Sequence, residues 1–212
     1  MSRLSSWIAS PEQRSLNHQP HKFDPAKAAR LDLPERQQML PNDRVVDLLD
    51  LRGSETVVDY GAGSGVLSVP VAERLPNGTV HAVDESPEML GHLEGRLGGT
   101  DLKNVHPHLI QGNHVDLEDG SVDRVLAVNL LHEVLGEGAL EEMRRLLRPD
   151  GFLLVVDWRA DVEREPGPPA DVSLTPGEGR ALLERAGFEV APLDERFPYH
   201  FAFKARPLVR AC

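Results

Sequence analysis

The sequence predicts an α/β fold in which helices cover both faces of a mostly parallel β-sheet. Short β-prone runs, at residues 80–84, 125–128 and 152–157, alternate along the chain with helix-compatible segments. This alternation is typical of a parallel sheet covered on both faces. A glycine-rich turn after an early strand is typical of sheets that bind a nucleotide at the carboxyl ends of their strands. The 212 residues of the chain suffice for one such domain with a sizeable core.

The first elements expected in chain order are a helix near residues 42–49 and a strand that ends at Val57 and Val58. The strand leads into a turn at residues 59–65, and a helix-compatible segment, 66–75, follows the turn. Glycine in such a turn adopts positive φ angles and leaves no Cβ between the backbone and a ligand. A strand, a glycine turn and a helix start in this order predict a binding site for a nucleotide-like ligand.

The spacing of the three glycines distinguishes between nucleotide cofactors. The chain has G-x-G-x-G, whereas the dinucleotide-binding fingerprint is G-x-G-x-x-G and has glycine or alanine where this chain has Val66. With an acid before it, the motif resembles the first motif of the class I S-adenosylmethionine (SAM)-dependent methyltransferases. The resemblance implies that the turn holds the methionine part of SAM and that Asp59 orients its amino end. The residues implied are Asp59, Tyr60, Gly61, Ala62, Gly63 and Gly65.

An acidic residue ends the next expected strand. The β-prone run 80–84 ends at Asp84, and Ser86 then caps the start of a helix. An acid about 20 residues beyond a glycine turn is placed to accept hydrogen bonds from the hydroxyls of a ribose. The resemblance implies this role for Asp84 with the SAM ribose, and it places Glu85 and Met89 beside adenine.

The segment after the third expected strand departs from the pattern of the resembled family. That family usually has Gly-Asp here, and the acid accepts a hydrogen bond from the adenine amine. This chain has Gly112 followed by Asn113, whose side-chain oxygen is still an acceptor. The resemblance implies that Asn113 and His114 contact adenine, with Asp116 as the alternative acceptor.

Residues 129–134 follow the fourth expected strand and correspond to the family motif that faces the substrate. The resemblance implies that Asn129 and Leu130 lie beside the methionine part of SAM. His132 is the candidate general base, because the unperturbed pKa of histidine lies near neutrality. Glu133 is the second catalytic candidate. The alternative for both residues is a structural role, in which they cap a helix or point to solvent.

Further landmarks of the family lie toward the C-terminus. A Pro-Asp-Gly turn at 149–151 precedes a buried strand, Thr175 caps a helix that ends at Gly187, and residues 199–205 alternate as the last strand. Over residues 44–206 the ordered motifs resemble the type 11 group of small-molecule methyltransferases. The resemblance implies a Rossmann-like, doubly wound, seven-stranded, mostly parallel sheet whose last strand is antiparallel.

Two segments lie outside these motifs. Residues 1–41 are expected to form a leader that folds over the SAM site as a lid, and residues 42–212 to form the SAM-binding methyltransferase domain. Residues 160–172 are rich in proline, glycine and charge. They are expected to form a loop that borders the substrate pocket.

Composition disfavours several classes of partner and site. The net charge of −11 disfavours nucleic acid, because an acidic surface repels phosphate backbones. No long apolar run is present, so no membrane partner is expected. The one cysteine, Cys212, fits a reducing, cytoplasmic setting and disfavours arsenic methylation, which uses several cysteines. The nine histidines, including His18 and His21, show no H-E-x-x-H pattern, so no metal is expected.

The resemblance implies a SAM-dependent methyltransferase that transfers a methyl group to a small molecule and releases S-adenosylhomocysteine (SAH). One alternative is a nicotinamide-dependent oxidoreductase of the same architecture, although Val66 and the missing Tyr-x-x-x-Lys pattern count against it. Another is a SAM-binding protein with little catalysis, which would carry the same glycine motif. The sequence identifies neither the methyl acceptor nor the atom that is methylated.

Overall fold

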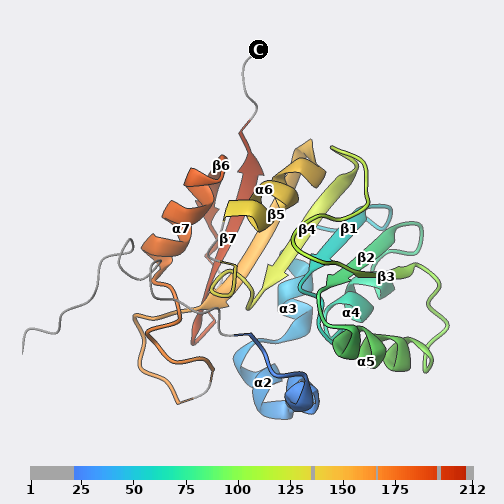
Figure 1. The fold of residues 1–212 in the computed structure, drawn as a ribbon, viewed down its shortest axis with the longest axis horizontal. Coiled ribbons are helices and arrows are strands. Elements are labelled where there is room, and N and C mark those ends of the chain that lie inside the picture. The colour runs from blue at the N-terminus through green and yellow to red at the C-terminus, as the bar shows by residue number, and fades with distance from the viewer. Residues whose placement is uncertain (1–21, 135–136, 166, 195–196, 209–212) are drawn as a thin grey trace, which may run out of the picture.

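The computed structural model describes residues 22–134, 137–165, 167–194 and 197–208. In this part of the chain a seven-stranded sheet has the order β3-β2-β1-β4-β5-β7-β6 (Figure 1). Strands β1 to β5 are parallel, and β7 is antiparallel to both of its neighbours. This topology confirms the predicted sheet with an antiparallel last strand. The strands are β1 (Thr56–Tyr60), β2 (Thr79–Asp84), β3 (Val105–Leu109), β4 (Val122–Val128), β5 (Leu147–Trp158), β6 (Phe188–Pro192) and β7 (His200–Pro207).

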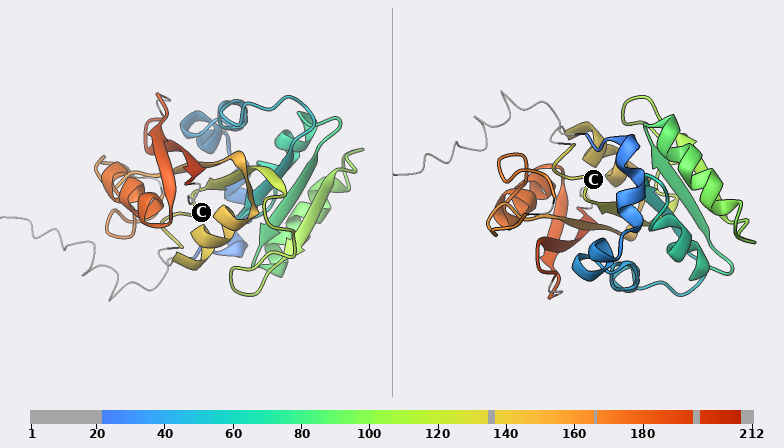
Figure 2. Two further views of the ribbon diagram at one scale, coloured as in Figure 1. Left: turned by 90° about the horizontal axis from the view of Figure 1, so that it is seen from above. Right: turned by 90° about the horizontal axis from the view of Figure 1, so that it is seen from below.

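Helices cover both faces of the sheet, as predicted (Figure 2). Each face has its own core of buried aliphatic side chains, with Leu93 in one core and Leu140 in the other. Removing such side chains from water is the main favourable contribution to folding. The helices α3 (Asn42–Asp47), α4 (Ser68–Glu73) and α5 (Pro87–Leu97) pack on one face, and α6 (Glu137–Leu146) and α7 (Pro176–Arg185) pack on the other.

The predicted helix caps at Ser86 and Thr175 are confirmed. The Ser86 hydroxyl accepts the N–H of Met89 at 3.2 Å at the start of α5. At the start of α7, Thr175 and Glu178 form a reciprocal capping box. Gly187 follows α7 with a φ of +86°, as expected for a residue just beyond a helix end. A cap of this kind is worth about 1 kcal/mol of stability.

The predicted Pro-Asp-Gly turn at residues 149–151 is wrong as a boundary, because these residues lie inside β5. The pairing between β4 and β5 shifts register there, from Val122 opposite Leu147 to Arg124 opposite Phe152. The extra residues of β5 form an irregularity in the strand, and regular pairing resumes at Phe152. The strand therefore begins before the Pro-Asp-Gly sequence, and these residues lie at the irregularity in its pairing.

The strand order places the predicted site at a topological switch point. Strands β1 and β4 are neighbours, and the strands after β1 (β2 and β3) lie on one side of this pair while those after β4 lie on the other. Ligands bind at such points, outside the carboxyl ends of the strands. The described part of the leader crosses this end of the sheet (Figures 1 and 2). It consists of the 3₁₀ helix η1 (Pro25–Asp32) and the helix α2 (Pro34–Met39).

Candidate active site

A cavity of about 870 Å³ lies at the carboxyl ends of β1, β2, β4 and β5. This volume is near the upper end of the range for small-ligand sites, so it has room for a cofactor and a second small molecule. The leader forms part of its wall through residues that include Phe23, Leu31, Arg36 and Met39. The predicted loop at residues 160–172 reaches the cavity at Gly167 and Pro168.

The structure brings most of the predicted site residues together around this cavity. Gly65 and His114 are the exceptions, because neither lines it. A Cβ on Gly65 would lie 2.3 Å from a methyl carbon of Leu93, so this glycine permits α5 to pack on the turn. The His114 side chain is exposed and contacts Glu142 at 3.2 Å. The predicted residues that line the cavity are Asp59, Tyr60, Gly61, Ala62, Gly63, Asp84, Glu85, Met89, Asn113, Asn129, Leu130, His132 and Glu133.

The glycine turn owes its shape to both backbone conformation and close packing. Gly61 and Gly63 have φ angles of +77° and +55°, a region that side chains rarely adopt. The N–H groups of Gly61 and Ala62 donate to the Val83 carbonyl at 2.8 and 2.9 Å. A Cβ on Gly61 would lie 2.9 Å from Leu130. The turn is thereby fixed between β2 and the loop that follows β4.

Asp59 is buried at the end of β1 and accepts a hydrogen bond from the Ser68 hydroxyl at 2.6 Å. Burial raises its pKa to about 6, the Ser68 hydrogen bond opposes this shift, and the charge of Asp84 adds to it. The hydrogen bond between Asp59 and Ser68 therefore links the end of β1 to the first residue of α4, across the glycine turn in sequence.

Asp84, at the end of β2, is already oriented by two backbone donors. Its carboxylate accepts the N–H of Gly63 at 2.7 Å and the N–H of Ser86 at 2.8 Å, one on each oxygen. Burial raises its pKa above the usual value, while these hydrogen bonds act in the opposite direction. Each oxygen has a second lone pair. The carboxylate can therefore accept two further hydrogen bonds, as the predicted role with a ribose requires.

The loop after β3 carries Asn113 to the cavity and is anchored at several points. The Tyr60 hydroxyl donates to the Asn113 carbonyl at 2.8 Å. Burial raises the pKa of Tyr60, with the nearby charge of Glu142 adding to the shift, so the hydroxyl remains a donor. Asp116, the alternative adenine acceptor, does not line the cavity. The structure thus favours Asn113 over Asp116 for this position.

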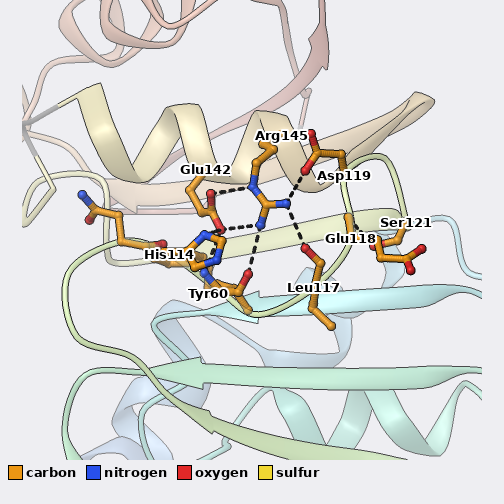
Figure 3. A network of polar contacts seen from close by, with 10 residues as sticks. Tyr60, His114, Leu117, Glu118, Asp119, Ser121, Glu142 and Arg145 are labelled. Carbon is orange, nitrogen blue, oxygen red and sulfur yellow. Dashed lines mark hydrogen bonds and ion pairs between the residues drawn. The ribbon is translucent and has the colours of Figure 1, made fainter.

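A polar network joins the same loop to helix α6 (Figure 3). Arg145 donates to the carbonyls of Val115 and Leu117 at 3.0 and 2.8 Å and to both carboxylate oxygens of Glu142. Glu142 in turn accepts the N–H of Val115 at 2.7 Å. The hydrogen bond from Arg145 lowers the pKa of Glu142, against the effect of burial. The network was not predicted, and it fixes the backbone next to Asn113.

His132 is paired with Asp157, a residue that sequence reasoning missed. His132 Nδ1 lies 2.7 Å from Asp157 Oδ1, and the His132 backbone N–H donates to Asp157 Oδ2 at 3.0 Å. Asp157 is fully buried near the end of β5 and also accepts the N–H of Trp158 at 2.6 Å. An acid at the penultimate position of an apolar strand, as Asp59 is in β1, was the available signal.

The electrostatics of this pair favour proton binding at His132. Burial alone would lower the pKa of the imidazole, but the Asp157 carboxylate outweighs burial, and the pKa is raised overall. Because Nδ1 faces Asp157, the other ring nitrogen, Nε2, is turned toward Glu133, 3.8 Å away. Burial raises the pKa of Glu133 to about 7, and the charge of His132 opposes this shift. A histidine with a raised pKa and a glutamate with a raised pKa therefore meet at the cavity wall.

Asn129 combines a left-handed backbone conformation with a buried side-chain oxygen that faces no donor among the described residues. Its φ is +55°, and its backbone N–H donates to Val156 at 2.8 Å. Its side-chain oxygen is buried and has no hydrogen-bond partner among the described residues. Buried polar atoms are nearly always hydrogen-bonded, so a donor from a ligand in the cavity would satisfy this oxygen.

Trp158 forms the wall next to the catalytic candidates. The Arg164 guanidinium lies 5.2 Å from the centroid of the indole and donates to Ser173 at 2.6 Å. The His200 ring also packs against the indole, at a centroid distance of 4.1 Å. The loop at residues 160–172 is thereby attached to the cavity through Trp158.

Two kinds of feature are absent from the described part of the chain. It contains no group of three or more His, Cys, Asp or Glu side chains arranged to hold a metal ion. The candidates His18 and His21 lie outside the described residues. None of the described helices is both long enough and apolar enough to cross a membrane.

Comparison with known proteins identifies the family to which the chain belongs. The family model described as a methyltransferase domain matches residues 57–151. The crystal structure of a SAM-dependent methyltransferase from Aquifex aeolicus has 31% sequence identity and a TM-score of 0.81. That match covers 87% of this chain and 98% of the Aquifex chain.

Curated relatives are named for different methyl acceptors. An arsenite methyltransferase of Halobacterium salinarum is 33% identical over an alignment of 158 residues, which covers 66% of this chain and 40% of the relative. A malonyl-[acyl-carrier protein] O-methyltransferase of Geobacter sulfurreducens is 28% identical over an alignment of 193 residues, which covers 82% of this chain and 72% of the relative. The chain thus spans less than half the length of the arsenite methyltransferase. The fold, the glycine turn and the Aquifex relative together show that the chain belongs to the class I SAM-dependent methyltransferases.

Proposed function

We propose that the protein transfers a methyl group from SAM to a small-molecule acceptor, with His132 as general base and Asp157 as its positioning residue. The observation that carries this proposal is the buried His132–Asp157 pair in the wall of the cavity formed by the cofactor-binding strands. A buried acid that holds one ring nitrogen fixes the orientation of a histidine and leaves its other nitrogen for proton transfer.

The residues around the cavity fit SAM in charge and in hydrogen-bonding capacity. Asp84 has lone pairs left for a ribose diol. Asn129 has a buried oxygen that lacks a donor, which the ammonium group of the methionine part would supply. Asn113 and Met89, which the resemblance implies beside adenine, both line the cavity. These assignments use the same residues that the resemblance implied, without Gly65 and His114.

The chemistry requires little from the protein beyond alignment and proton removal. The sulfonium group of bound SAM supplies an already activated methyl carbon. The walls of the cavity exclude water and hold the acceptor in line with the methyl group, which is a large part of the barrier reduction in such reactions. His132 Nε2 then accepts the proton that an oxygen, nitrogen or carbon acceptor loses on methylation. The raised pKa of His132 makes it a stronger base than a free imidazole.

Several observations support a small-molecule acceptor. The cavity of about 870 Å³ is walled by the leader and by the loop at Gly167, and the net charge of −11 disfavours nucleic acid. The acceptors named in the relatives, arsenite and malonyl-[acyl-carrier protein], differ from each other, so the acceptor of this chain does not follow from them. The single cysteine argues against arsenite and supports a reducing, cytoplasmic setting.

We further propose that the leader, residues 1–41, acts as a lid on the domain formed by residues 42–212; residues 1–21 of this prediction lie outside the described part of the chain. Support comes from the described leader residues, such as Phe23 and Leu31, which line the cavity. Closure of a lid excludes water from the reacting groups. Hydrogen exchange of residues 22–41 should slow when SAH binds. Equal exchange with and without SAH would contradict the lid.

The test of the catalytic proposal is the variant His132→Ala. It should reduce turnover by about 10²–10⁴-fold, the usual contribution of a general base, while the dissociation constant for SAH stays nearly unchanged. His92→Ala, on the exposed side of α5, is the matched control and should keep wild-type turnover. If His132→Ala instead lowers thermal stability and leaves turnover intact, His132 is a structural residue and alignment alone drives the reaction.

A further inference from the structure

We propose that Arg36, in the leader helix α2, binds the carboxylate of SAM and so makes the leader a sensor of the amino-acid end of the cofactor. This inference rests on the proposed cofactor site. It adds a binding residue that neither the glycine motif nor the family comparison indicates. Three points support it: the location of Arg36, its buried Nε atom and lack of an acidic partner among the described residues, and the charge of the cofactor.

The first observation is the location of the guanidinium. Arg36 lines the cavity and donates through Nη1 to the side-chain oxygen of Asn42 at 2.5 Å. Asn42 donates in turn to the carbonyl of Val66 at 2.8 Å, and Val66 directly follows the glycine turn. Arg36 is therefore held at the glycine-turn end of the cavity.

The second observation is that Arg36 lacks an acidic partner among the described residues. Asp32, four residues earlier in the leader, is paired with another residue: both of its carboxylate oxygens accept hydrogen bonds from Arg96 at 2.9 Å. The Nε atom of Arg36 is buried without any hydrogen-bond partner in the described structure. Burial lowers the pKa of the guanidinium, and the charge of Asp32 opposes this shift. A desolvated cation with an unused donor is costly unless an anion joins it.

The third point is the charge of the cofactor in the orientation proposed above. Asp84 marks the ribose, and the glycine turn above Asp59 marks the methionine part, so the carboxylate of SAM lies beyond the turn. This carboxylate is the one anionic group on SAM. A guanidinium binds a carboxylate with two parallel hydrogen bonds, which gives both strength and direction. Position and charge at this end of the cavity therefore match a carboxylate ligand.

The contacts around Arg36 also link the leader to the glycine turn. Arg96, which holds Asp32 of the leader, donates through Nε to the carbonyl of Ser64 at 3.0 Å. The leader is thus tied to the turn on two sides, through Asn42 and through Arg96. Binding of the carboxylate by Arg36 would fix α2 over the cofactor, so a ligand without the amino-acid part should leave the leader less protected.

The test compares SAH with 5′-methylthioadenosine, which has the same adenosine and sulfur but no amino-acid part. By isothermal titration, Arg36→Met should weaken SAH binding by about 10- to 100-fold, the worth of a charge-assisted hydrogen-bond pair. Binding of 5′-methylthioadenosine should stay within about twofold of wild type. Arg36→Lys keeps the charge but not the paired donors, and it should give an intermediate loss.

The control is Arg185→Met, which removes an exposed positive charge at the end of α7 from a residue that does not line the cavity. It should leave both ligands bound as in the wild type. Equal losses of SAH affinity in Arg185→Met and Arg36→Met would show a general charge effect and overturn the inference. Equal losses for both ligands in Arg36→Met would make Arg36 a structural residue and overturn it as well. Failure of the wild type to bind SAH at all would instead contradict the proposed cofactor site.

Discussion

Replacement of Asp157 by asparagine separates the structural role of the buried pair from its chemical role. Asp157 accepts three hydrogen bonds, from the His132 backbone, the His132 ring and Trp158. Asparagine keeps one acceptor oxygen. If that oxygen takes the place of Oδ1, the amide group faces the backbone N–H of His132 and leaves one buried donor unsatisfied. The expected loss of stability is about 1–3 kcal/mol, measured by urea denaturation.

The same variant changes the pKa of the base. Asp157 raises the pKa of His132 against the effect of burial, so removal of the negative charge lowers it. The acidic limb of the pH–turnover profile should move to lower pH, and maximal turnover should fall by about 10- to 100-fold, because the base is weaker. Asp161→Asn removes an exposed acid that pairs with Arg159 at 2.9 Å and should change stability by less than about 1 kcal/mol. An unchanged acidic limb in Asp157→Asn would refute the assignment of that limb to His132.

Three further predictions concern the cofactor, the fold and the pH dependence of stability. Asp84→Ala should weaken SAH binding by about 1–3 kcal/mol in titration calorimetry, and unchanged binding would exclude Asp84 from the ribose site. Gly65→Ala should lower stability by about 1–3 kcal/mol, because its Cβ would meet Leu93 at 2.3 Å at a φ of +77°. The control Gly91→Ala, which meets nothing within 4 Å, should be neutral or slightly stabilising in the same thermal scan. Burial lowers the pKa of His200 from 6.5 to about 4, so the unfolded chain binds a proton that the folded chain does not. Stability should then fall by up to about 3 kcal/mol between pH 6.5 and pH 4, and His200→Phe should flatten that slope in urea titrations.

Local chemistry explains why much of the fold was predictable. A cap such as Ser86 is set by neighbours within one helical turn, and the glycine turn by backbone geometry that few residues adopt. An acid such as Asp84 is recognisable because its strand and the preceding turn lie close in sequence. The parallel order of the strands then brings these local features to one edge of the sheet.

The features that were missed depend on contacts between distant segments. Asp157 becomes part of the site only because β5 lies beside β4, which places it against His132, 25 residues earlier. Gly65 reads as a ligand-binding glycine, yet the packing of α5 decides its role. The irregular pairing within β5 is likewise a matter of register between two strands, which no single segment encodes.

The central claim is that SAM lies across the carboxyl ends of β1, β2 and β4 with its sulfur facing His132. A crystal structure of the protein with SAH tests this claim most directly. The account predicts both ribose hydroxyls within hydrogen-bond distance of Asp84 and the sulfur in the part of the cavity bounded by His132 and Trp158. SAH bound elsewhere, or bound with its ribose away from Asp84, would contradict it.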